Sequence, residues 1–275
     1  MDIKMRPSNT PEKIEFIDSH CHLDMEAFAP DLDEVLDRAH RAGVTNIVTI
    51  GIDRDSSEQA VLLAGRYPSV YASVGVHPHD SSGVNDKDFD RIAQLSTHEK
   101  VVGYGEIGLD YAKMYSPKEV QQQVFSRQLA LAQELNLPVI IHDRDAHEDT
   151  LKILKEHAPF PAGGVLHCFS GDSTFAEQIV ELGFFVSIPG IVTFKNAKAL
   201  QQVAVDLPLQ SMLIETDGPF LAPVPFRGKR NTPELLLHTA EKIAQLRNLT
   251  LRAVAAQTTD NTRALFNLPS TVTTQ

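Results

Sequence analysis

The sequence predicts an α/β fold, a closed (β/α)8 barrel of the TIM type in a single domain. Eight short apolar runs, most of them rich in Val and Ile, recur from end to end of the 275-residue chain. Such runs are typical of parallel strands that are buried on both faces. Amphipathic stretches lie between the runs, and strands that alternate with helices indicate the α/β class. Eight strand–helix pairs give about 34 residues per unit, close to the roughly 30 residues of a βαβ unit.

The apolar runs are mostly four to seven residues long, as expected for barrel strands. An open doubly wound sheet is the alternative architecture. We favour the closed barrel because it is built from eight such strands. The predicted strands are Ile14–Ile17, Asn46–Ile50, Val70–Val76, Val101–Tyr104, Pro138–Ile141, Gly164–His167, Phe184–Ile188 and Met212–Ile214.

Helices are predicted where apolar residues recur at helical spacing. The helix from residue 116 has the most complete start signal, because Ser116, Pro117 and Glu119 resemble a cap, a first-turn proline and a capping-box acid. The predicted helices are Asp31–Ala42, Asp55–Tyr67, Asp86–Leu95, Ser116–Glu134, Asp145–Glu156, Ser173–Leu182, Ala197–Asp206, Pro233–Leu246 and Thr250–Phe266.

The composition is that of a globular protein, with 42% hydrophobic and 22% charged residues. No linker divides the chain, so we expect a short polar extension at 1–13, one barrel domain at 14–268 and a frayed end at 269–275. The net charge of −11 excludes a broad basic face for nucleic acid. Two cysteines, no apolar run long enough to span a membrane and no secretory signal indicate a cytoplasmic protein. No obligate protein partner is evident.

Polar residues cluster where the apolar runs end. In a barrel the carboxyl ends of the strands share one rim, which is where active sites are built. The residues at these ends are Asp18, His20, His22, His77, His79, Glu106, His142, Asp143, His167, Glu215 and Asp217.

These side chains predict a site for two divalent metal ions. Because side chains alternate along a strand, His20 and His22 point the same way, and Asp18 would join them. The other ligands expected at the barrel axis are His142, His167, Glu106 and Asp217. Glu106, on a middle strand, would bridge the ions. Two ions about 3.5–4 Å apart can activate a water and hold the attacking and leaving oxygens of a substrate.

A single buried histidine is more often a hydrogen-bonded core residue than a ligand, but six such residues at one rim favour a metal site. Four imidazoles favour Zn, Mn, Ni or Fe over Mg. Cys21 and Cys168 each adjoin a predicted ligand and should face away from the ions. Both are interpreted as reduced, small hydrophobic residues.

A basic loop follows the last strand. It holds Arg227, Gly228, Lys229 and Arg230, and Thr232 with Pro233 should cap and start the next helix. Arginine forks suit phosphate oxygens, and barrels often bind phosphate in this region. We therefore predict that Arg227 and Arg230 contact a substrate phosphate. A solubilising surface loop is the alternative.

Six motifs resemble the TatD family of metal-dependent hydrolases over residues 16–266. They are FIDSHCHLD, GVHPH, GEIGLDY, IHDRDAHEDT, HCFSG and ETDGPFLAPVPFRGKRNTP. The complete His-x-His pair makes the chain similar to the YcfH-like branch. The resemblance implies a metallo-dependent hydrolase barrel, usually a deoxyribonuclease that is described as Mg-dependent. It implies His20, His22 and Asp217 at the first metal, His142 and His167 at the second, and Glu106 between them.

The favoured function is a 3′–5′ deoxyribonuclease that cleaves DNA ends or single strands. A water activated by two metals would attack phosphorus, with Asp217 accepting or orienting its proton and Glu106 completing the catalytic pair. His77 and His79 would add contacts to the phosphate beside the two arginines. One alternative is a metallohydrolase of another ester or an amide, such as an aminoacyl-tRNA ester or a lactone. A non-enzymatic metal-binding protein is disfavoured, because structural zinc sites tend to be closed and rich in cysteine.

Overall fold

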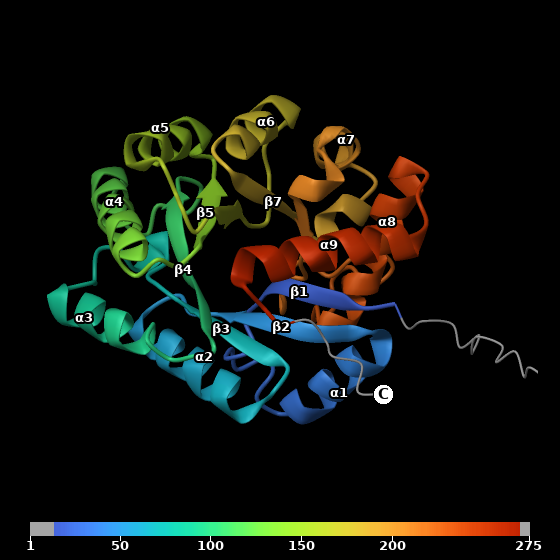
Figure 1. The fold of residues 1–275 in the computed structure, drawn as a ribbon, viewed down its shortest axis with the longest axis horizontal. Coiled ribbons are helices and arrows are strands. Elements are labelled where there is room, and N and C mark those ends of the chain that lie inside the picture. Colours follow the sequence, from blue (N-terminus) through green and yellow to red (C-terminus); the bar gives the residue numbers. More distant parts are fainter. Residues whose placement is uncertain (1–13, 270–275) are drawn as a thin grey trace, which may run out of the picture.

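The computed structural model describes residues 14–269, which form a barrel of eight parallel strands surrounded by helices (Figure 1). The strands pair in sequence order from β1 to β8. The predicted barrel is confirmed and the open sheet is wrong. The strands are β1 (Phe16–Cys21), β2 (Val44–Ile50), β3 (Val70–Val74), β4 (Val101–Asp110), β5 (Val139–Arg144), β6 (Gly164–Leu166), β7 (Phe184–Ile188) and β8 (Met212–Ile214).

Closure of the barrel brings together predicted site residues from the two ends of the sequence. The His22 amide donates to Gly218 O at 2.7 Å, and the Asp217 amide donates to His20 O at 2.9 Å. The segment after β8 is thereby hydrogen-bonded beside the end of β1. This pairing fixes the backbone of three predicted metal ligands.

The helices alternate with the strands on the outside of the barrel (Figure 1). None of the helices within residues 14–269 is long and apolar enough to cross a membrane. They are α1 (Leu32–Ala42), α2 (Arg54–Arg66), α3 (Asp86–Leu95), α4 (Lys118–Glu134), α5 (His147–His157), α6 (Ser173–Glu181), α7 (Lys198–Asp206), α8 (Leu236–Arg247) and α9 (Leu251–Phe266).

The helix α9 closes the end of the barrel opposite the predicted site. Thr259 donates from its hydroxyl to Glu15 O, and Asn261 donates to Met212 O, both at the amino ends of strands. Phe266 packs in one buried cluster with Ile17 and Leu213. Since one end is filled by this helix, the opposite rim is the end left for a site.

The capping residues predicted for two helices are wrong. The helix α4 begins at Lys118, and the buried Ser116 hydroxyl donates instead to His79 O and accepts from the Ser82 amide, each at 3.0 Å. Thr232 makes no capping bond, and Pro233 opens a 3-10 turn before α8. The Ser116 hydroxyl therefore holds the loop around His79 and does not cap α4.

Two predictions concern the chain ends. The polar extension at 1–13 lies outside the described residues, as does all but the first residue of the frayed segment at 269–275.

Candidate metal centre

Glu106 stands at the centre of the rim, with its two carboxylate oxygens facing different imidazoles. It lies in β4 and is 2% exposed. Its Oε2 is 3.5 Å from His20 Nε2 and 3.7 Å from His22 Nε2. Its Oε1 is 2.7 Å from both His142 Nδ1 and His167 Nε2. The residue predicted to bridge two ions thus lies between two groups of ligand atoms.

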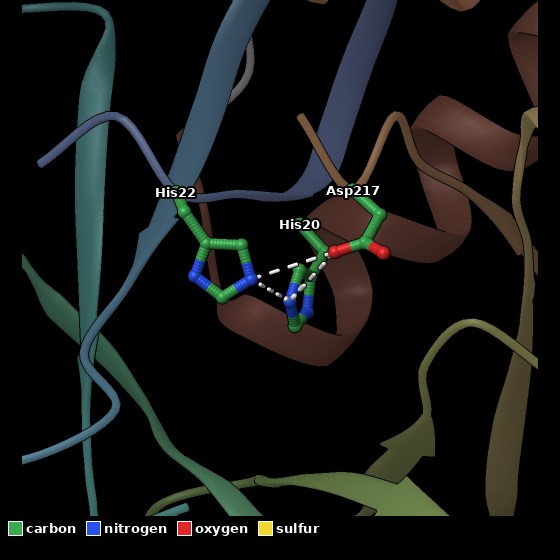
Figure 2. A group of neighbouring side chains, drawn as sticks. All are labelled: His20, His22 and Asp217. Atoms are coloured by element: carbon green, nitrogen blue, oxygen red, sulfur yellow. Dashed lines mark hydrogen bonds and ion pairs between the residues drawn. The ribbon is translucent and has the colours of Figure 1, made fainter. Parts of the chain in front are cut away.

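The first group joins His20, His22 and Asp217, whose ligand atoms point toward one another (Figure 2). The two Nε2 atoms are 3.3 Å apart, and Asp217 Oδ1 is 3.4 Å from His22 Nε2 and 3.8 Å from His20 Nε2. Four ligands on a tetrahedral ion, with bonds of about 2.1 Å, lie about 3.4 Å apart. With Glu106 Oε2 as the fourth atom, the observed spacing suits such an ion.

The second group surrounds Glu106 Oε1. His142 Nδ1 and His167 Nε2 are 3.2 Å apart, and His77 Nε2 lies 3.4 Å from the same carboxylate oxygen. His142 and His167 together with this oxygen supply three ligand atoms. Three protein ligands leave at least one position of a four-coordinate ion for water or substrate. This group can therefore hold an ion that is open to a reactant.

Neighbouring imidazoles keep the two carboxylates ionised although burial opposes this. Burial acts to raise the pKa of Glu106, but the His167 and His77 imidazoles hold that pKa well below its usual range. Burial likewise opposes ionisation of Asp217, yet a hydrogen bond from His22 lowers the pKa of Asp217. Burial also lowers the pKa of His20, which favours the neutral imidazole that a metal requires.

Asp110 orients His142, a role that the sequence reasoning missed. Its Oδ2 lies 3.3 Å from His142 Nε2 and 2.9 Å from His79 Nε2, while its Oδ1 accepts from the amides of Ala112 and Lys113. A histidine that binds a metal through Nδ1 carries its proton on Nε2, where it can donate to Asp110. The signal was available, since Asp110 ends β4 inside the GEIGLDY motif.

Glu215 lies beside His167 on the side away from Glu106, as Asp110 lies beside His142. Its Oε1 lies 3.6 Å from His167 Nδ1 and accepts from the Cys168 amide at 2.5 Å. Glu215 is fully buried. The sequence placed it at the rim but gave it no role, because only the folded chain brings the end of β8 beside the end of β6.

Strand alternation does not hold for two residues. Asp18 does not join the first group, since its carboxylate accepts from the Thr216 amide and hydroxyl, and the register of β1 shifts between Asp18 and Cys21. Cys168 lies beyond the end of β6 at Leu166 and has a left-handed φ of 43°, so the strand alternation used to predict its direction does not apply to it. Cys21 is buried and its thiol meets Gly218 O, as expected of a residue directed away from the imidazoles.

The two arginines predicted to contact phosphate differ in whether their guanidinium groups already have partners in the protein. Arg230 donates to both carboxylate oxygens of Asp31, at 2.8 and 2.7 Å, and also to Ala27 O. Arg227 is exposed, with its guanidinium 4.5 Å from the centre of the Phe194 ring. The guanidinium of Arg230 is therefore held in an ion pair with Asp31, whereas that of Arg227 packs against the Phe194 ring and has no ion pair among residues 14–269.

Replacing Asp110 with Asn should weaken metal binding by about tenfold or more, because the amide keeps the turn acceptor but loses the charge that orients His142. Titration of the metal-free protein with Zn²⁺ measures the effect. The matched control is Asp86→Asn, since Asp86 is an exposed partner of Arg127. Equal affinities for the two variants would show that Asp110 does not orient a ligand.

The chain matches known proteins over almost its whole length. Residues 17–267 match the family described as TatD related DNase. The uncharacterized metal-dependent hydrolase YabD of Bacillus subtilis is 45% identical over 91% of this chain and 98% of its own. YcfH of Escherichia coli K12, also named an uncharacterized metal-dependent hydrolase, is 40% identical over 92% and 96%.

Two further matches bear on the fold and the chemistry. The Salmonella typhimurium protein named 3′-5′ ssDNA/RNA exonuclease TatD is 36% identical over 90% of this chain and 97% of its own. The crystal structure of YJJV, a TatD homologue from Escherichia coli K12, superimposes with a TM-score of 0.88 at 35% identity, covering 93% and 99% of the two chains. The chain therefore belongs to the TatD family of metal-dependent hydrolases.

Proposed function

We propose that this hydrolase is a 3′–5′ deoxyribonuclease that binds two divalent ions and cleaves DNA at ends or in single strands. The observation that carries the proposal is Glu106, whose two oxygens face two separate groups of ligand atoms. A pair of ions suits in-line displacement at phosphorus. The name of the Salmonella relative, an exonuclease of single-stranded DNA and RNA, supports this substrate class.

The roles of the residues follow from their positions. We assign His20, His22 and Asp217 to one ion, His142 and His167 to the other, and Glu106 to both. Bound there, the ions would supply Lewis acidity and a water of lowered pKa. Asp217, an ionised member of the first group, would also accept the proton of the attacking water.

His77 and Arg227 would hold the phosphate beside these ligands. His77 lies against Glu106, while His79 donates toward Asp110 and is 28% exposed at its side chain. Arg227 would supply an exposed cation from the loop after β8. Arg230, also predicted as a phosphate contact, would reach a phosphate only by leaving Asp31, so we assign it the weaker contribution.

Replacing Arg227 with Ala should raise KM for single-stranded DNA severalfold and leave kcat nearly unchanged, because a contact made equally in ground and transition states affects binding alone. The comparison is Arg230→Ala, which removes the ion pair to Asp31 and should act on thermal stability more than on KM. Steady-state kinetics and a melting curve of each variant give the answer. If both variants match the wild type in KM, phosphate recognition by this loop is excluded.

A defined activity panel tests the function itself. The metal-free protein is loaded with Zn²⁺, Mn²⁺, Ni²⁺ or Mg²⁺ and offered single- and double-stranded DNA, RNA, a small phosphate diester, a lactone and an amide. We expect release of mononucleotides from the 3′ end of DNA and two metal equivalents by elemental analysis. Turnover of the lactone or amide with intact DNA would overturn the proposal.

A further inference from the structure

Two exposed aromatic side chains stand on loops at the rim. Phe220 is 48% exposed and Tyr115 is 67% exposed. Among the large hydrophobic side chains that are exposed within residues 14–269, these two are the aromatic ones. Their loops follow β8 and β4, so both arise at the carboxyl ends of strands, where the metal ligands also lie.

Phe220 is fixed next to the first group of ligands. Its amide donates to Asp217 O at 2.9 Å, which closes a turn that begins at a ligand residue. Its ring meets the His22 ring edge-on, with centroids 6.0 Å apart and planes at 70°. The ring therefore lies against the first group, with about half of the residue's surface open.

Tyr115 is fixed at the other side. Its ring meets the His79 ring at 4.7 Å and 80°. The next residue, Ser116, is buried and bonded both to His79 O and to the Ser82 amide. His79 in turn shares Asp110 with His142, a ligand of the second group.

A continuous row of rings connects the two aromatic side chains through the metal centre. Neighbouring centroids along the row are 3.8 to 6.4 Å apart. Phe220 ends the row beyond the first group, and Tyr115 ends it beyond the second. In order, the row is Tyr115, His79, His142, His167, His20, His22 and Phe220.

Apolar exposure at this rim is concentrated on the same two loops. Five of the eight exposed large hydrophobic side chains in the described part of the chain belong to them, the other three of the five being Met114, Leu221 and Val224. A phosphodiester bond held between the two groups of ligands has a nucleoside on each side. An apolar aromatic face on each side suits a base and not a phosphate.

We propose that Phe220 and Tyr115 are stacking platforms for the nucleobases on either side of the scissile phosphate, and that they select single-stranded nucleic acid. The inference rests on the proposed nuclease function. Every base has a flat π-face, so stacking tolerates sequence, and paired bases in a duplex have their faces covered by their neighbours. This acidic protein then needs few cationic side chains against the phosphate backbone of the strand, because stacking of two bases supplies part of the binding affinity.

The test combines variants that lack one aromatic ring with oligonucleotides that lack one base. The variants Phe220→Leu and Tyr115→Leu keep apolar bulk but lose the flat face, Tyr115→Phe keeps the face, and Leu62→Ala alters an exposed apolar residue on α2 as a control. Each is assayed for kcat/KM on a single-stranded oligonucleotide and on copies that carry one abasic tetrahydrofuran residue at successive positions from the 3′ end.

We expect each Leu variant to lose on the order of tenfold in kcat/KM on the intact strand. Tyr115→Phe and Leu62→Ala should match the wild type. For each ring, one abasic position should lower wild-type turnover by a similar factor and abolish the effect of that Leu variant.

Equal losses on intact and abasic strands, or no loss on either, would overturn the stacking role while leaving the nuclease intact. A wild-type protein that cleaves no nucleic acid in the metal panel, but hydrolyses the lactone or amide, would instead overturn the nuclease function. The two failures are therefore distinguishable.

Discussion

Replacing Glu106 with Gln should lower kcat/KM by about a thousandfold or more, equivalent to about 4 kcal/mol of transition-state stabilisation. Glu106 faces both groups of ligand atoms, so no other side chain in residues 14–269 compensates for it. An amide carries no charge and offers one oxygen in place of two. The variant should therefore retain at most one tightly bound ion.

Elemental analysis and single-turnover kinetics measure the two effects together. The matched control is Glu58→Gln, because Glu58 forms a surface ion pair with Arg91, and such pairs contribute about 1 kcal/mol or less to stability. Circular dichroism establishes that the Glu106 variant is folded. A folded variant with two metal equivalents and wild-type turnover would exclude the bridging role.

The barrel was predictable because its signals are local. Each buried strand begins with an apolar run, and the polar residue that reaches the rim comes directly after that run, as His142 does within β5 and His167 does after β6. The pairing of His20 with His22 also needs only alternation along one strand. The convergence of Glu106 with these imidazoles then follows from closure of the barrel.

The remaining features depend on contacts between distant parts of the chain. Arg230 was predicted to be available for phosphate, but its partner Asp31 lies 199 positions away. Glu215 supports the turn at Cys168 across 47 positions. The spacing of apolar and polar residues along the sequence does not predict such pairs. Strand alternation predicted that the Cys168 side chain faces away from the ions. That rule does not apply, because β6 ends at Leu166 and the backbone of Cys168 is left-handed.

Asp217 is the residue that we expect to accept the proton of the attacking water. Changing it to Asn should lower kcat by about 10²–10⁴-fold, the range for loss of a general base. Asn retains an oxygen that can meet the first ion, so metal content should fall less than in the Glu106→Gln variant. KM should change little, because the lost interaction belongs to the transition state.

The comparison between Asp217→Asn and Glu106→Gln separates metal binding from proton transfer. Asp37→Asn, at an exposed position on α1, serves as the control for removing a carboxylate charge. If Asp217→Asn loses metal as completely as Glu106→Gln, Asp217 acts as a ligand alone and its role as proton acceptor is rejected. If its kcat equals that of the control, neither role stands. Metal retained with kcat reduced at least a hundredfold is the result that assigns the proton to Asp217, since the fold and the ions are then in place and the carboxylate charge is what has been removed.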